Sequence, residues 1–130
     1  MGAFVFGILL AIIPSAGLAQ GGDTMTNVLT GIPYQDTGMG SRALINEPHL
    51  QLMQAALKPR QSVPQHNANS NVHILVVEGS IVVDLAGKEF PLETGDILPV
   101  AYQTSMHIDN VSPENASFLI IKTPNPSQMK

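Results

Sequence analysis

The sequence predicts an all-β fold, and three observations on its 130 residues support this class. Short apolar runs follow one another from Arg42 onward, without the spacing of an amphipathic helix. Turn residues separate these runs, which recur about every ten residues, as in β-sandwiches and β-barrels. The length suits one domain with a substantial core.

The first expected strands run up to Gly87. Residues 49–57 alternate at their start, which places Leu50 and Leu52 on one face of a strand. The runs 71–79 and 80–87 are rich in β-branched residues, as strands are. They meet at Glu78-Gly79-Ser80, which we predict to be a tight hairpin turn.

The remaining expected strands are divided by further turns. Ala86-Gly87-Lys88 forms a turn that leads into 88–92. A Gly-Asp turn precedes the next run, and we expect the Asp96 side chain to cap it. The last expected strands are 93–100, 104–108 and 116–122.

Charge is scarce in this chain. Charged residues make up 12% and hydrophobic residues 44%, against roughly 25% charged residues in an average domain. A face buried against a second subunit would explain this, so we expect a homodimer. The formal charge of −4 and the absence of a basic cluster argue against nucleic acid and anionic membranes as partners. There are no cysteines, which excludes disulfides and thiolate chemistry.

The first 24 residues are predicted to lie outside the functional domain. Residues 2–20 are almost entirely apolar and end with Gly17 and Ala19 at the spacing of a signal-peptidase site. As a signal peptide, residues 1–19 would direct the protein to the periplasm or outside the cell. However, no Lys or Arg precedes the apolar run, and Pro14 interrupts it. We therefore favour translation starting at Met25, which makes the protein cytoplasmic.

The start at Met25 predicts a feature of the gene. Gly21-Gly22-Asp23 can be encoded as GGA-GGT-GAT, a bacterial ribosome-binding sequence at a workable distance from the codon of Met25. Sequencing codons 21 to 25 checks this expectation. A stretch without that purine-rich string would contradict the internal start and favour the signal peptide.

The expected strands resemble a small single-domain cupin of the RmlC-like, cupin-2 type. The first cupin motif runs Gly, five residues, His-x-His, three or four residues, Glu, six residues, Gly. When its last glycine is placed on Gly79, its first histidine falls on His66, its second on Ala68 and its glutamate on Val72.

The second motif runs Gly, five residues, Pro-x-Gly, two residues, His, three residues, Asn. Placing its first glycine on Gly95 puts the proline on Ala101, the glycine on Gln103, the histidine on Met106 and the asparagine on Asn110. The spacing is thus kept, while most of the metal-binding residues are replaced.

The resemblance implies a cupin double-stranded β-helix, which is a jelly-roll barrel, in a single domain. It divides the chain into the apolar segment 1–24, an N-terminal arm 25–41, the barrel 42–123 and a loose tail 124–130.

The resemblance also implies a degenerate metal site. Of the four ligand positions only His66 carries a strong donor, whereas a firmly held divalent ion needs about three. Ala68 and Val72 cannot bind a metal, and Met106 offers a thioether, which suits copper rather than iron or manganese. His66 itself is equally well explained as a hydrogen-bonded polar residue at the mouth of the barrel.

His73 and His107 each lie one residue from a vacated ligand position. Successive side chains of a strand point to opposite faces of the sheet, so both are expected to point outward. Only a β-bulge beside either histidine would turn it into the barrel.

We therefore interpret the chain as a cupin-fold small-molecule-binding protein without a firmly bound metal. His66, Ala68, Val72 and Met106 are its expected pocket residues, and no catalytic set can be assembled. One alternative is a dioxygenase, isomerase or lyase that uses Fe, Mn, Ni, Cu or Zn on His66 and His107, or less readily on His73. Another is a packed barrel that acts through its dimer surface.

Overall fold

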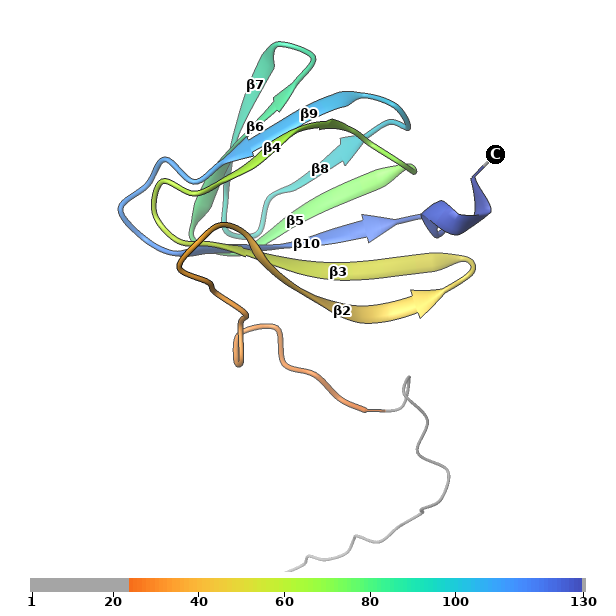
Figure 1. Cartoon of the computed structure of the whole chain (residues 1–130), viewed down its shortest axis with the longest axis horizontal. Helices are drawn as coiled ribbons and strands as arrows, with labels where there is room; N and C mark the ends of the chain where they lie inside the picture. Colours follow the sequence, from red (N-terminus) through yellow and green to blue (C-terminus); the bar gives the residue numbers. More distant parts are fainter. Residues whose placement is uncertain (1–23, 130) are drawn as a thin grey trace, which may run out of the picture.

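Residues 24–129 are described by the structure, a computed structural model, and they form two antiparallel sheets stacked as two layers (Figure 1). One sheet has the strand order β2-β3-β10-β5-β8, and the other β4-β9-β6-β7. The strands are β2 (Gly40–Glu47), β3 (Leu50–Leu57), β4 (Ser62–Asn67), β5 (Val72–Glu78), β6 (Ser80–Leu85), β7 (Lys88–Glu93), β8 (Ile97–Val100), β9 (Ser105–Asp109) and β10 (Ala116–Lys122). A short 3-10 turn, η4, covers Pro126–Gln128. The predicted all-β class is confirmed.

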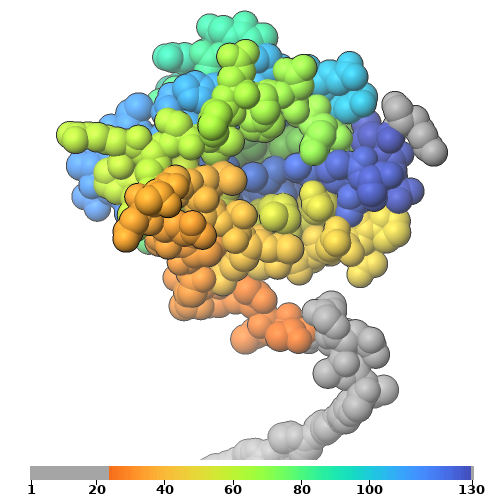
Figure 2. All heavy atoms as spheres, in the orientation of Figure 1, coloured from red at the N-terminus to blue at the C-terminus, as the bar shows by residue number. Residues whose placement is uncertain are grey.

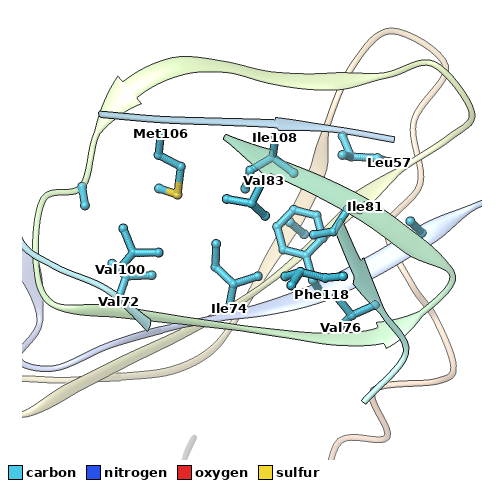
Figure 3. Close-up of a cluster of buried hydrophobic side chains, with 14 residues drawn as sticks. Leu57, Val72, Ile74, Val76, Ile81, Val83, Val100, Met106, Ile108 and Phe118 are labelled. Atoms are coloured by element: carbon cyan, nitrogen blue, oxygen red, sulfur yellow. The ribbon is translucent and has the colours of Figure 1, made fainter. Parts of the chain in front are cut away.

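Alternate side chains of the facing strands fill the space between the sheets. In β5, Val72, Ile74 and Val76 are buried, while His73 between them is exposed. Phe118 of β10 is fully buried. Figure 3 shows the ring of Phe118 close to Val76 of β5, and shows Val72 further along β5. The aromatic ring therefore closes one end of the barrel, and smaller side chains line the other.

Gly79 makes a corner between the sheets, so the predicted hairpin at Glu78-Gly79-Ser80 is wrong. β5 pairs with β10 and β8, whereas β6 pairs with β7 and β9. A single residue is too short for a hairpin loop, which takes at least two. Gly79 has φ 73°, and a Cβ there would lie 2.3 Å from the Asn115 carbonyl oxygen. The chain therefore crosses from one sheet to the other at a residue without a side chain.

The predicted turn at Ala86-Gly87-Lys88 is the true hairpin, between β6 and β7. Ala86 and Gly87 both have positive φ, at 52° and 94°, the pattern of a type I′ turn. The Asp84 carboxylate accepts a hydrogen bond of 2.8 Å from the Gly87 backbone N–H. The expected cap at Asp96 is also confirmed, because its carboxylate accepts a hydrogen bond of 2.8 Å from the Glu93 backbone N–H.

Two strands were not predicted from the sequence. β2 begins inside the segment expected as an arm, and β4 runs through the polar stretch around His66. Both carry many polar residues, so neither shows a clear apolar run. Pairing with β3 and β9 respectively makes them strands.

A fully buried glutamine holds the N-terminal arm against the five-stranded sheet. Gln54 donates from Nε2 to the Val28 carbonyl and to Ser117 Oγ, both at 2.8 Å. Its Oε1 accepts from Arg42 Nε and Nη2 at 2.9 and 2.7 Å. The arm makes a second contact with this sheet, where the Tyr34 hydroxyl donates a hydrogen bond of 2.7 Å to Glu78 Oε1. Figure 2 shows the arm, in orange, packed against the barrel.

The C-terminal residues 124–129, expected as a loose tail, are tied to the sheet at Asn125. This side chain is 8% exposed and donates from Nδ2 to Asn46 Oδ1 at 2.7 Å. It also donates to the Glu47 carbonyl at 3.2 Å, at the end of β2.

Residues 24–129 include no helix that is both long and apolar enough to span a membrane. The expectations of a signal peptide and of an untranslated start fall on residues outside the described range.

The corner predicts that two glycine substitutions will differ in cost. Gly79→Ala and Gly87→Ala both force a side chain onto positive φ, which costs about 1–2 kcal/mol. Only Gly79→Ala also meets the backbone, since a Cβ at Gly87 would have nothing within 4 Å. We expect Gly79→Ala to lower the free energy of unfolding in urea by clearly more than Gly87→Ala. Equal losses of unfolding free energy would contradict this expectation, because they would mean that the backbone at the corner moves away from the added Cβ at no cost.

Candidate functional site

A cavity of about 190 Å³ lies between the two sheets, at the end of the barrel away from Phe118. In Figure 3, Val72 and Met106 face each other across this end from opposite sheets. The lining residues come from both sheets and from the segments just before β2 and after β4. They are Met39, Ser41, Met53, Val63, His66, Ala68, Asn69, Val72, Ile74, Met106, Ile108, Ile120 and Lys122.

The lining changes from apolar to polar towards the solvent. Five apolar residues of the lining are buried, namely Ala68, Val72, Ile74, Met106 and Ile108. The polar residues of the lining all reach solvent: Ser41, His66 and Asn69 are exposed, and Lys122 is half-buried. The cavity thus has an apolar interior with polar groups at its opening, which is the usual arrangement of a small-molecule site.

A β-bulge in β4 turns His66 towards the cavity. Val63 pairs with Ile108 of β9, and both line the cavity. The next pair is His66 with Met106, which uses three steps along β4 and two along β9. Without the extra residue, alternation would put Val63 and His66 on opposite faces. The bulge at residues 64–65 therefore places the imidazole in the cavity.

The same bulge orients the imidazole ring. His66 Nδ1 lies 2.9 Å from the Pro64 carbonyl oxygen. A carbonyl oxygen only accepts hydrogen bonds, so Nδ1 carries the proton. In the neutral ring Nε2 then holds the lone pair and is free to accept a hydrogen bond or to bind a metal.

Lys122 lines the cavity from the end of β10, and its burial removes water from the ammonium group. This loss of hydration lowers the pKa of Lys122 below its ordinary value. Within residues 24–129, no carboxylate lies within 4 Å of its Nζ, since the ion pairs of that part of the chain are Lys58–Asp36 and His107–Asp109. The cavity therefore holds a half-buried cation that has no anionic partner there.

The structure brings all four expected pocket residues together. His66, Ala68, Val72 and Met106 all line this cavity, although their binding of a ligand stays a prediction. His73 lies on the outer face of its sheet, exposed between the buried Val72 and Ile74.

His107 also lies outside the barrel. Its neighbours in β9, Met106 and Ile108, are buried, and the extra residues at the register shifts of the described strands lie in β2, β4 and β5. His107 Nε2 is 3.4 Å from Asp109 Oδ1 on the outer face, and Asp84 is its partner on β6. His66 and His107 therefore do not converge. Residues 24–129 also contain no group of three or more His, Cys, Asp or Glu side chains that could hold a metal.

Lys122 is a charged cavity residue that sequence reasoning missed. The signal was present in the run 116–122, where Phe118, Ile120 and Lys122 alternate on one face of the strand. Ser41 could not be found in this way, because its strand β2 was itself not predicted.

No protein-family model matches the sequence. The chain is similar to uncharacterized protein MJ0764 of Methanocaldococcus jannaschii, with 28% identity over 87 residues that cover 66% of this chain and 75% of that protein. The crystal structure of that protein is described as an RmlC-like cupin family protein with a double-stranded β-helix fold. It superposes with a TM-score of 0.65 at 23% identity, covering 73% of this chain and 90% of that one.

Other solved structures agree on the architecture. A cupin superfamily protein from Desulfitobacterium hafniense superposes with a TM-score of 0.68 at 17% identity, covering 86% of this chain and 99% of that one. A cupin 2 conserved barrel domain protein from Leptotrichia buccalis gives a TM-score of 0.67 at 21% identity, covering 75% and 47%. The chain therefore has the RmlC-like cupin fold, a double-stranded β-helix.

The bond to the Pro64 carbonyl predicts the tautomer of His66. At a pH where the ring is neutral, long-range ¹H–¹⁵N NMR spectra should show Nδ1 protonated and Nε2 bare. His49, an exposed histidine outside the cavity, serves as the reference. A bare Nδ1 in His66 would contradict the arrangement of the bulge.

Proposed function

We propose that this chain is a small-molecule-binding protein of cupin fold, whose ligand occupies the cavity between the sheets. The observation that carries the proposal is the graded lining, with buried apolar residues inside and the polar groups of His66, Asn69 and Lys122 at the opening. Burial of an apolar ligand surface supplies the driving force, and a few polar groups fix its orientation.

The volume limits the size of the ligand. Pockets for drug-sized molecules measure roughly 300–1,000 Å³, whereas this cavity measures about 190 Å³. An engineered apolar cavity of roughly 150 Å³ holds one benzene. The proposed ligand therefore has one ring or a short branched chain, with a polar group that remains near the opening.

The lining favours binding without a firmly held metal. His66 is the one imidazole among the lining residues, and His73 and His107 belong to the outer surfaces. The thioethers of Met39, Met53 and Met106 are soft, weak donors. A divalent ion in this cavity would lack the three strong protein ligands that such an ion needs. The proposal is therefore of binding rather than of metal-dependent catalysis.

Filling the cavity tests the proposal. Ala68 is 3% exposed and lines the cavity, so the ring of Ala68→Phe should occupy the space of the ligand. One-ring organic fragments, neutral and charged, would be screened by ligand-observed NMR against the full chain. We expect saturable binding to the parent and its loss in Ala68→Phe.

The control is Ala101→Phe, which adds the same ring at an exposed loop position outside this cavity. It should bind as the parent does, and melting curves show whether both variants are folded. Fragments that bind Ala68→Phe as well as the parent would place the binding site elsewhere. A parent that binds no fragment would overturn the proposed function.

A further inference from the structure

We propose that the ligand of this cavity is an organic carboxylate, and that Lys122 binds its anionic group. The inference rests on the proposed function, because it names the chemical class of the ligand for the same cavity. The observation behind it is a half-buried cation at the opening of a largely apolar cavity, without a carboxylate of residues 24–129 within ion-pair distance.

The cation is unusual for its position on the strand. Alternation makes Lys122 the last member of an inward row in β10, after Ala116, Phe118 and Ile120. Lysine is among the residues least often buried without a partner, because its ammonium loses hydration. The outward positions nearest to it on the same strand, Leu119 and Ile121, are apolar. The charge therefore faces the cavity where an apolar residue would cost less.

A bound carboxylate would compensate for this cost. An ion pair with Lys122 replaces the hydration that the ammonium has lost, and the partly apolar surroundings weaken the attraction less than bulk water does. The lowered pKa of Lys122 has the same cause, namely burial without a compensating charge.

The imidazole at the opening is less suited to an anion than the ammonium of Lys122. His66 donates Nδ1–H to Pro64, so its Nε2 in the neutral ring is an acceptor, as are carboxylate oxygens. It can instead accept from a hydroxyl of the ligand. Among the lining residues, Lys122 is the one lysine or arginine, so the carboxylate is assigned to it.

Size and charge together define the ligand class. It is a monocarboxylate with one ring or a short branched chain, whose apolar part lies against Val72, Ile74 and Met106. Its carboxylate remains at the opening, beside Lys122.

The experiment compares matched one-ring probes, namely benzoate, benzyl alcohol and benzylamine, by titration of the full chain. Benzoate should bind more tightly than benzyl alcohol, and benzylamine most weakly. In Lys122→Met, which keeps most of the side-chain length, benzoate should bind roughly ten- to hundredfold more weakly, as expected for loss of a bond to a charged group. Benzyl alcohol should bind that variant at least as tightly as it binds the parent.

Two further variants separate this effect from a change in net charge or fold. Lys88→Met removes the same charge from an exposed lysine over the Phe90 ring and should leave benzoate binding unchanged. Lys122→Arg should retain much of the preference for benzoate. Unliganded Lys122→Met should melt no lower than the parent, because it removes an uncompensated charge.

The possible outcomes distinguish this inference from the proposed function. Benzoate and benzyl alcohol that bind equally, with Lys122→Met unchanged, would overturn the carboxylate assignment and leave small-molecule binding in place. A preference for benzylamine would also overturn the assignment. If none of the probes and none of the screened fragments bind, both proposals fail.

Discussion

The alternation of side chains along each strand is the constraint on which the cavity depends. In β5 it turns Val72 and Ile74 inward and His73 outward, and in β9 it turns Met106 inward and His107 outward. A side chain one residue away cannot substitute for an inward one without shifting the whole apolar set of its strand. The interior is therefore apolar at Val72 and Met106, two of the positions where the cupin motifs carry metal ligands, although a histidine follows each of them in the sequence.

The bulge of β4 is the local exception, and it supplies the oriented polar group of the opening. It adds one residue between Val63 and His66, so that both side chains face the cavity. Pro64 suits this place, because it has no N–H to lose from the ladder and its carbonyl accepts from the ring of His66. One irregularity thus sets the direction of the imidazole and the nitrogen that it presents to a ligand.

The remaining polar group of interest, Lys122, needs no irregularity, because regular alternation brings it inward from the end of β10. A half-buried ammonium in an apolar wall lowers the stability of the unliganded protein, whereas the fully buried Gln54 is stabilised by bonds to the arm, to Arg42 and to Ser117. The contrast indicates that the fold satisfies its structural polar groups internally. Lys122 has no anionic partner among the described residues, and this supports the proposal that its partner is an anionic ligand.

The class of the fold and much of the composition of the cavity could be predicted from the amino-acid sequence alone. The alternating runs located β5, β9 and β10, and the motif spacing placed Ala68, Val72 and Met106 inside. The same motif spacing puts Gln103 at the glycine position of the second motif. In the structure Gln103 has a φ of 70°, which is the left-handed conformation that favours glycine. These features are local, since they depend on side-chain type and on a period of two residues.

Features that depend on contacts between distant segments could not be predicted in this way, and they are seen in the folded chain. The turn at Gly79 has the local signals of a hairpin, but its strands pair with β10 and β9 and so belong to different sheets. The polar β4 becomes a strand because its backbone pairs with that of β9. The bulge of β4 is visible only as a register shift against β9. The position of Lys122 at the cavity could likewise not be predicted, because the other side chains that line the cavity come from strands far apart in the sequence.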